Sequence, residues 1–151
     1  MTLIAGAFSR DANGVPITNK GLVVTKVRAY TGAAGLGAQG ASTLFTVTGD
    51  VSIGIFANCS EDLAGANATI EVGISGNTAA LIAQTTATTI DNGEIWLDTS
   101  PATVENYPTE KLLIAGTDII ETIATNDITD GTLTFYCVWF PFSADANVVA
   151  A

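Results

Sequence analysis

The sequence contains no histidine, and charged residues make up only 13% of its 151 residues. Histidine is the most frequent general base of enzymes and the commonest metal ligand, so both roles would fall to carboxylates or thiols. No cluster of such residues takes over either role in the sequence. We therefore expect no enzymatic activity, no cofactor and no bound metal.

The chain has only two cysteines, Cys59 and Cys137, each inside an apolar stretch and without a Cys-x-x-Cys spacing. Unpaired cysteine is among the most buried residue types. The sequence therefore predicts two buried free thiols, with a disulfide between them as the alternative.

Long apolar runs are also missing. No run reaches the ~18–20 residues of a membrane span. The opening residues lack the cationic stretch with which a signal peptide begins. We expect no membrane partner and synthesis in a cytoplasm.

Basic residues are scarce and unevenly placed. The first 28 residues hold four of the five: Arg10, Lys20, Lys26 and Arg28. With one acid, Asp11, this segment has a net charge of +3, whereas the remainder has one lysine against fourteen acids, a net charge of −13. The acidic body would repel phosphates, which excludes nucleic acid as the expected partner. The basic segment is expected to dock on an acidic surface, either its own body or a neighbouring copy.

Alternating apolar and polar residues predict strands along most of the chain, separated by turns rich in Gly, Asn and Asp. The predicted strands are 22–28, 42–48, 51–57, 68–74, 79–83, 94–97, 111–115, 119–123 and 132–140. Hairpins are expected at 75–78 and between the strands 111–115 and 119–123. Val51, Ile53 and Ile55 are expected to share a buried face.

This pattern predicts an all-β fold, an antiparallel β-sandwich or jelly roll of about eight or nine strands with an extended N-terminal arm. Residues 1–20 form the arm and residues 21–151 a single β domain.

Two loops carry motif-like spacing. Gly35-Leu-Gly37-Ala-Gln-Gly40 matches Gly-x-Gly-x-x-Gly, but a strand follows where a dinucleotide site requires a helix. Asn126–Gly131 spaces its acids loosely like a calcium loop but lacks the later glutamate. Both segments are interpreted as ordinary connections between strands.

Two sets of side chains could act on carbohydrates, one by hydrolysis and one by binding. Glu61, Asp62, Glu94 and Asp98 are the nearest carboxylates in sequence, but nothing opposes one to another as hydrolysis requires. A second set could form an aromatic platform for sugars: Trp96, Tyr136, Trp139, Phe140 and Phe142. Because neighbouring residues of a strand point to opposite faces, Trp139 and Phe140 divide between the core and a second face. Core and subunit contacts are the favoured interpretation of this set.

Four stretches of the chain carry a resemblance: Met1–Phe8, the Gly-rich loop Thr31–Gly40, the hairpin Ile70–Ala83 and the tail Ser143–Ala151. They resemble virion structural proteins of tailed bacteriophages, and among these the small capsid decoration (head cement) proteins. The resemblance implies a small β-rich protein, often trimeric, that binds the outside of the capsid lattice. It carries over no catalytic residue.

On this resemblance, the expected function is a virion protein that binds the major capsid protein on the outer surface of the phage head and stabilises it. It would be made in the bacterial host cytoplasm, and a homotrimer is favoured. The alternatives are a tail or head-fibre component, and a carbohydrate-binding β-sandwich module.

The expected interface residues lie at the two chain ends and in the Gly-rich loop. Apolar side chains at chain ends stay in water unless a partner covers them, and an arm can add a strand to a neighbouring sheet. The expected residues are Thr2, Leu3, Ile4, Phe8, Arg10, Lys20, Leu36, Val148 and Val149.

Overall fold

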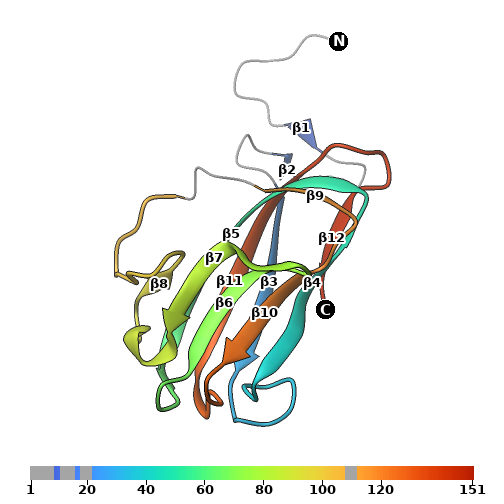
Figure 1. Ribbon diagram of the computed structural model, residues 1–151. Coiled ribbons are helices and arrows are strands. Elements are labelled where there is room, and N and C mark those ends of the chain that lie inside the picture. Colours follow the sequence, from blue (N-terminus) through green and yellow to red (C-terminus); the bar gives the residue numbers. More distant parts are fainter. Residues whose placement is uncertain (1–8, 11–15, 18–21, 108–111) are drawn as a thin grey trace.

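The computed structural model describes residues 9–10, 16–17, 22–107 and 112–151, the first two pairs by their main chain only. Ten strands of this part form two five-stranded antiparallel sheets (Figure 1). One 3-10 helix, η1 (Ala87–Thr89), follows the strand that ends at Thr86. No helix in the described ranges has the length and apolar character needed to cross a membrane. The prediction of an all-β antiparallel sandwich is confirmed.

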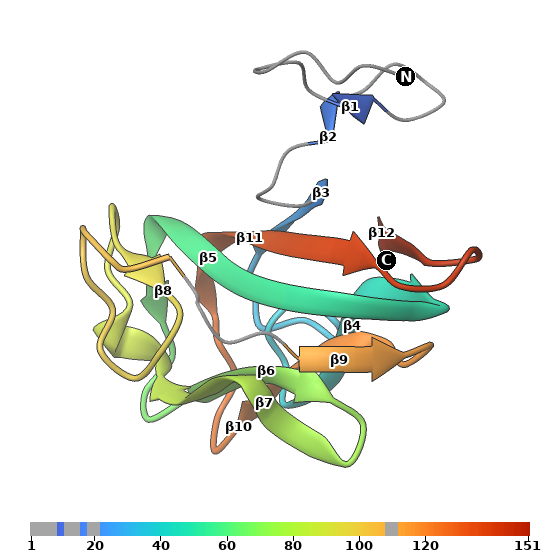
Figure 2. The ribbon, with the colours of Figure 1, turned by 90° about the horizontal axis from the view of Figure 1, so that it is seen from above.

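The first sheet has the strand order β12-β4-β10-β6-β7. Its strands are β4 (Gly40–Thr48), β6 (Thr69–Ile74), β7 (Asn77–Thr86), β10 (Ile119–Ala124) and β12 (Asn147–Ala150). The second sheet has the order β3-β11-β5-β8, and β9 also pairs with β5. Its strands are β3 (Leu22–Ala29), β5 (Asp50–Ala64), β8 (Ile95–Trp96), β9 (Leu112–Ala115) and β11 (Asp130–Pro141). Seen from above, β6 and β7 lie in one layer and β5 and β11 in the other (Figure 2).

The core fills the space between the two sheets. Val51, Ile53 and Ile55 of β5 are buried on one face, as their alternation predicted. From β11, alternate residues point inward: Leu133, Phe135, Cys137 and Trp139. Cys59 and Cys137 are buried free thiols, which confirms that prediction.

The predicted hairpin between residues 111–115 and 119–123 is wrong. Leu112–Ala115 pairs with β5, whereas Ile119–Ala124 lies between β4 and β6 in the other sheet. The turn between them therefore crosses from sheet to sheet, and Gly116 N donates to Gly49 O at 2.9 Å. A short turn between two apolar runs looks the same in sequence whether the runs pair with each other or with distant strands.

The tenth strand was not predicted, because the C-terminal tail was interpreted as an apolar end. Residues 147–150 pair with β4, Val148 opposite Val47, and Val148 is 4% exposed in the core. Val148, one of the expected interface residues, is therefore covered by its own chain. Val149, on the other side of the strand, is 46% exposed.

Within the predicted N-terminal arm, β1 (Ser9–Arg10) pairs antiparallel with β2 (Pro16–Ile17), Ser9 opposite Ile17. The expected interface residues Thr2, Leu3, Ile4, Phe8 and Lys20 lie outside the described residues. For Arg10 only the main chain is described. Leu36 lies in the loop between β3 and β4 and is 41% exposed.

Candidate interaction surface

The second sheet turns a face with few charged side chains away from the core, and Asp50 of β5 lies at its edge beside Ala115. We call this the outer face and define it by thirteen residues of β3, β5, β9 and β11. They are Val23, Thr25, Val27, Ser52, Gly54, Phe56, Asn58, Leu113, Ala115, Thr134, Tyr136, Val138 and Phe140. A face with so few charges on a chain with a net charge of −10 is a candidate for contact with another surface.

The strand register places the outer-face side chains next to one another. Val138 lies opposite Val23 on one side and Gly54 on the other. Tyr136 lies opposite Phe56, and their rings stack with centroids 5.0 Å apart and an interplanar angle of 12°. Such cross-strand pairs stabilise a sheet even where one face is open to solvent.

Several apolar side chains of this face remain in water. Val23 is 59% exposed, Val27 is 61% exposed and Leu113 is 72% exposed. An antiparallel sheet with one free face normally carries polar residues there. The first sheet follows this rule more closely, with Thr46, Thr48 and Glu71 among its outward residues.

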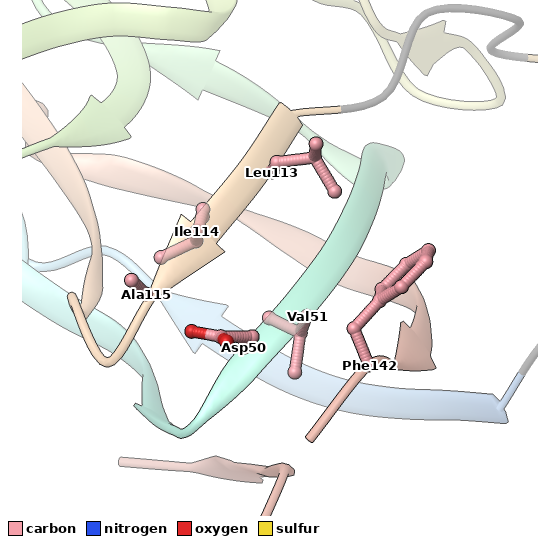
Figure 3. A pocket seen from close by; sticks show the side chains of 6 residues that line it. All are labelled: Asp50, Val51, Leu113, Ile114, Ala115 and Phe142. Atoms are coloured by element: carbon pink, nitrogen blue, oxygen red, sulfur yellow. The ribbon is translucent and has the colours of Figure 1, made fainter.

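A pocket of about 350 Å³ opens at the β9 end of the outer face. Its walls are Asp50, Val51, Leu113, Ile114, Ala115 and Phe142. Figure 3 shows Leu113 and Phe142 on opposite sides of β5, with Asp50 and Val51 between them. The pocket is thus largely apolar with one carboxylate at its margin, and Phe142 is 68% exposed beside it.

A smaller pocket of about 130 Å³ adjoins the stacked rings. Phe56, Ile95, Leu97, Glu105, Asn106 and Tyr107 line it. It is apolar except for Glu105 and Asn106 and extends the outer face toward the segment after β8.

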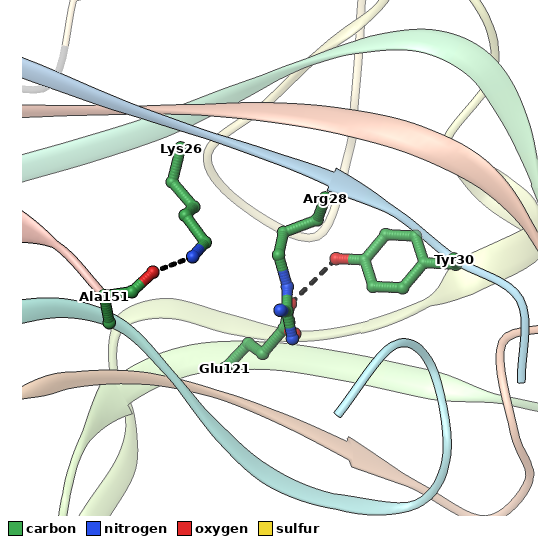
Figure 4. Close-up of polar contacts among 5 residues, drawn as sticks. All are labelled: Lys26, Arg28, Tyr30, Glu121 and Ala151. Carbon is green, nitrogen blue, oxygen red and sulfur yellow. Dashed lines mark hydrogen bonds and ion pairs between the residues drawn. The ribbon is translucent and has the colours of Figure 1, made fainter. Parts of the chain in front are cut away.

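The two basic side chains that the structure describes both point away from the outer face (Figure 4). The Arg28 guanidinium donates from Nε to Glu121 Oε1 at 2.8 Å and contacts the same oxygen through Nη2. The Tyr30 hydroxyl donates to Glu121 Oε2 at 2.8 Å. Lys26 Nζ donates to the main-chain oxygen of Ala151. Part of the basic N-terminal segment thus docks on its own acidic body.

Burial controls the ionisation of this cluster. Glu121 is fully buried, and desolvation raises the pKa of its carboxyl group, while Arg28 and Tyr30 oppose that rise. Burial also raises the pKa of Tyr30 well above its ordinary value, reinforced by the charge of Glu121. Because β3 belongs to the second sheet and β10 to the first, the cluster joins the two layers.

The other candidate carboxylates bind nearby donors of their own chain. Asp62 Oδ1 accepts from Asn92 N at 2.6 Å, and Asp98 Oδ1 accepts from Ser100 N at 2.7 Å. Glu94 Oε2 accepts from Asp91 N at 3.0 Å, and Glu61 Oε2 accepts from Thr132 Oγ1 at 2.9 Å. These contacts stabilise turns and the β5–β11 pair and form no opposed catalytic pair.

The two motif-like loops pack against each other. Ile128 N donates to Gly37 O at 2.8 Å, and Gln39 N donates to Asp127 Oδ1 at 2.9 Å. Across the described ranges, no group of three Cys, Asp or Glu side chains is placed to hold a metal ion. Both loops connect strands, as the sequence interpretation proposed.

The candidate aromatic platform is divided between the two faces. Trp96 and Trp139 are buried in the core, and Trp96 Nε1 donates to Thr85 Oγ1 at 2.9 Å. Tyr136 and Phe140 lie half-buried on the outer face, with exposed Phe142 beyond them. The expectation that Trp139 and Phe140 separate between core and a second face is confirmed.

Comparison of the chain with protein-family models, curated proteins and solved structures gave no match. The function therefore has to be inferred from the surface itself.

The structure brings together residues that the sequence interpretation had left apart. Leu113 and Phe56 were not predicted as interface residues, yet they join Val23 and Val27 on one face. The sequence did contain an indication of this face. In the strand 132–140, neither the even-numbered nor the odd-numbered residues include a charged side chain. A strand without charge on either side is expected to be covered on both faces.

Proposed function

We propose that this protein is a non-catalytic structural module that binds a protein lattice through the outer face of its second sheet. The observation that carries this proposal is the largely apolar outer face, on which Val23, Val27 and Leu113 are more than half exposed. Burying apolar surface stabilises a complex by roughly 25 cal/mol per Å² before the costs of association.

The area of the outer face is small for a stable interface by itself, so it suits one of several contacts that hold a subunit in an assembly. Each of its thirteen residues covers roughly 6.6 Å along the strand and 4.8 Å across it, so the face covers about 400 Å² in plan. A standard stable interface buries about 800 Å² on each partner. A face of this size suits a subunit that gains its affinity from repeated contacts on a lattice.

The specific proposal is a capsid decoration protein of a tailed phage, bound to the major capsid protein on the outside of the head. The resemblance of four stretches of the chain and the absence of histidine support this role. A tail or head-fibre component would use the same kind of surface and is the alternative within the same particle.

A carbohydrate-binding module is supported less well. Sugar sites present an aromatic ring face to the ligand, but Phe56 and Tyr136 each use one ring face against the other. Trp96 and Trp139, the two tryptophans, are buried.

The first experiment asks whether the protein is part of a virion. Particles would be purified from lysates of the bacterium that encodes the chain, then analysed by mass spectrometry and labelled with antibody for electron microscopy. We expect the chain in the particles, with label on the outside of the head. Its absence from the particles, or label on the tail alone, would contradict the decoration proposal.

The second experiment tests the outer face. Capsids lacking the protein would be mixed with the purified chain and sedimented. Val27→Asp and Leu113→Asp should each weaken binding at least about tenfold, because each places a charge in the buried contact. Thr46→Asp, on the exposed outer side of the first sheet, is the matched control and should bind normally. Equal binding by all three variants would exclude the outer face.

A further inference from the structure

The residues that line the pocket at the β9 end of the outer face indicate the chemistry of a ligand that would fit it. Leu113, Ile114, Val51 and Phe142 provide apolar walls, and Asp50 places a carboxylate at the margin. Its volume of about 350 Å³ exceeds the ~150 Å³ cavity that holds benzene in another protein. The fitting ligand is an aromatic or large aliphatic side chain with a cation close by.

The strand next to the pocket offers main-chain groups as well. β9 is four residues long and pairs with β5, and no other described strand pairs with it. The outer edge of such a strand leaves N–H and C=O groups for an added extended segment. In this mode of binding, the main chain provides affinity and pockets for alternate side chains provide specificity.

The sequence of residues 2–10 has the matching chemistry. In residues 2–10, Ile4, Phe8 and Arg10 fall on one side of an extended chain because their spacing is even. Residues two apart on one side are about 6.6 Å apart, so Arg10 lies within reach of a carboxylate when Phe8 enters a pocket. Ser9–Arg10 has strand geometry in the structure.

Charge complementarity also favours the binding of residues 2–10 at this pocket. Lys26 and Arg28 bind Ala151 and Glu121 of their own chain, so neither of these cations is paired with Asp50. Arg10 is a remaining cation that adjoins an apolar segment other than β9 itself. Its attraction to Asp50 would also offset the repulsion between two acidic bodies.

We propose that residues 2–10 of one copy bind the β9 pocket of a second copy, with Phe8 in the pocket and Arg10 against Asp50. Leu113 and Phe142 are 72% and 68% exposed in the single chain, so the pocket is open to an occupant from another copy. This inference names a partner, a second copy of the chain, and does not depend on the identity of any capsid.

The test measures self-association of the full-length chain by sedimentation velocity. Phe8→Ala should raise the dissociation constant at least about tenfold, as truncation of a buried aromatic anchor does. Arg10→Glu and Asp50→Arg should each weaken association, and the double variant should restore it to near the wild-type value. Glu71→Arg makes the same charge change on the first sheet and should leave association unchanged or strengthen it.

Restoration by the double variant is the decisive result, because a folding defect in either single variant would not be repaired by the other. Additive weakening in the double variant would overturn the proposal, as would a wild-type chain that stays monomeric at every concentration.

A second measurement distinguishes binding at the pocket from nonspecific association. A labelled peptide of residues 1–12 would be titrated into full-length Phe8→Ala protein and followed by fluorescence anisotropy. We expect saturable binding that Leu113→Asp abolishes. Absence of binding, or binding that Leu113→Asp leaves intact, would overturn the proposal. Loss of self-association by Phe8→Ala with unchanged capsid binding would leave the proposed function standing, so the two can fail separately.

Discussion

Replacing Arg28 by methionine removes the cation from the buried cluster and leaves the Glu121 carboxylate without its charge partner. Glu121 is fully buried and receives two contacts from Arg28 and one from the Tyr30 hydroxyl at 2.8 Å. Breaking a buried ion pair by removing one partner costs about 3–5 kcal/mol, because the remaining charge is neither solvated nor paired. We expect Arg28→Met to lower the free energy of unfolding by this amount.

The effect of Arg28→Met should depend on pH in a defined direction. Burial already raises the pKa of Glu121 in the folded state, so the folded protein binds this proton more tightly than the unfolded chain. The stability that such a group contributes is lost as the pH rises from its ordinary pKa through its raised pKa in the folded state. Without Arg28 the pKa rises further, so the cost of Arg28→Met should be smaller near pH 5 than at pH 7.

The assay is urea denaturation followed by tryptophan fluorescence, since Trp96 and Trp139 are both buried. The double variant Arg28→Met/Glu121→Leu is the control. Replacing a whole buried pair by apolar residues is often neutral, so the double variant should recover most of the loss. If Arg28→Met costs less than ~1 kcal/mol, or if the double variant is as unstable as the single one, the reasoning is refuted.

Three further predictions concern stability. Trp139→Ala should lower the unfolding free energy by roughly 3–5 kcal/mol, since Trp139 lies in the core, and an unchanged denaturation midpoint would contradict this. Burial raises the pKa of Cys137 from 9.0 to about 12, so above pH 9 the unfolded chain loses this proton while the folded protein keeps it. The free energy of unfolding should therefore fall by about 1.4 kcal/mol per pH unit above pH 9, and Cys137→Ala should reduce that slope. Gly37 has φ +111° and an added Cβ would lie 2.0 Å from Ile128 O, so Gly37→Ala should cost more than ~2 kcal/mol. Gly35→Ala, at φ +72° in open space, should cost only ~1 kcal/mol, and equal thermal shifts for the two would disprove the close-contact argument.

The sequence determined the class of fold and the inward face of the strand 51–57. Alternation with period 2 was enough to place Val51, Ile53 and Ile55 inside, because a strand side chain has only two directions to point. It also placed Lys26 and Arg28 on the opposite side of their strand from Val23 and Val27. These inferences need no knowledge of which strands are neighbours.

Only the tertiary structure decided which strands pair and which surfaces result. Residues 112–115 and 119–124 are separated by one short turn, yet they lie in different sheets. Val148 is buried because β12 pairs with β4, a contact across about a hundred residues that no local pattern encodes. The outer face and its pocket arise in the same way, since Leu113, Phe56 and Val27 become neighbours only through register. Pairing depends on the combined burial and hydrogen bonding of distant segments, whereas alternation depends on each segment alone.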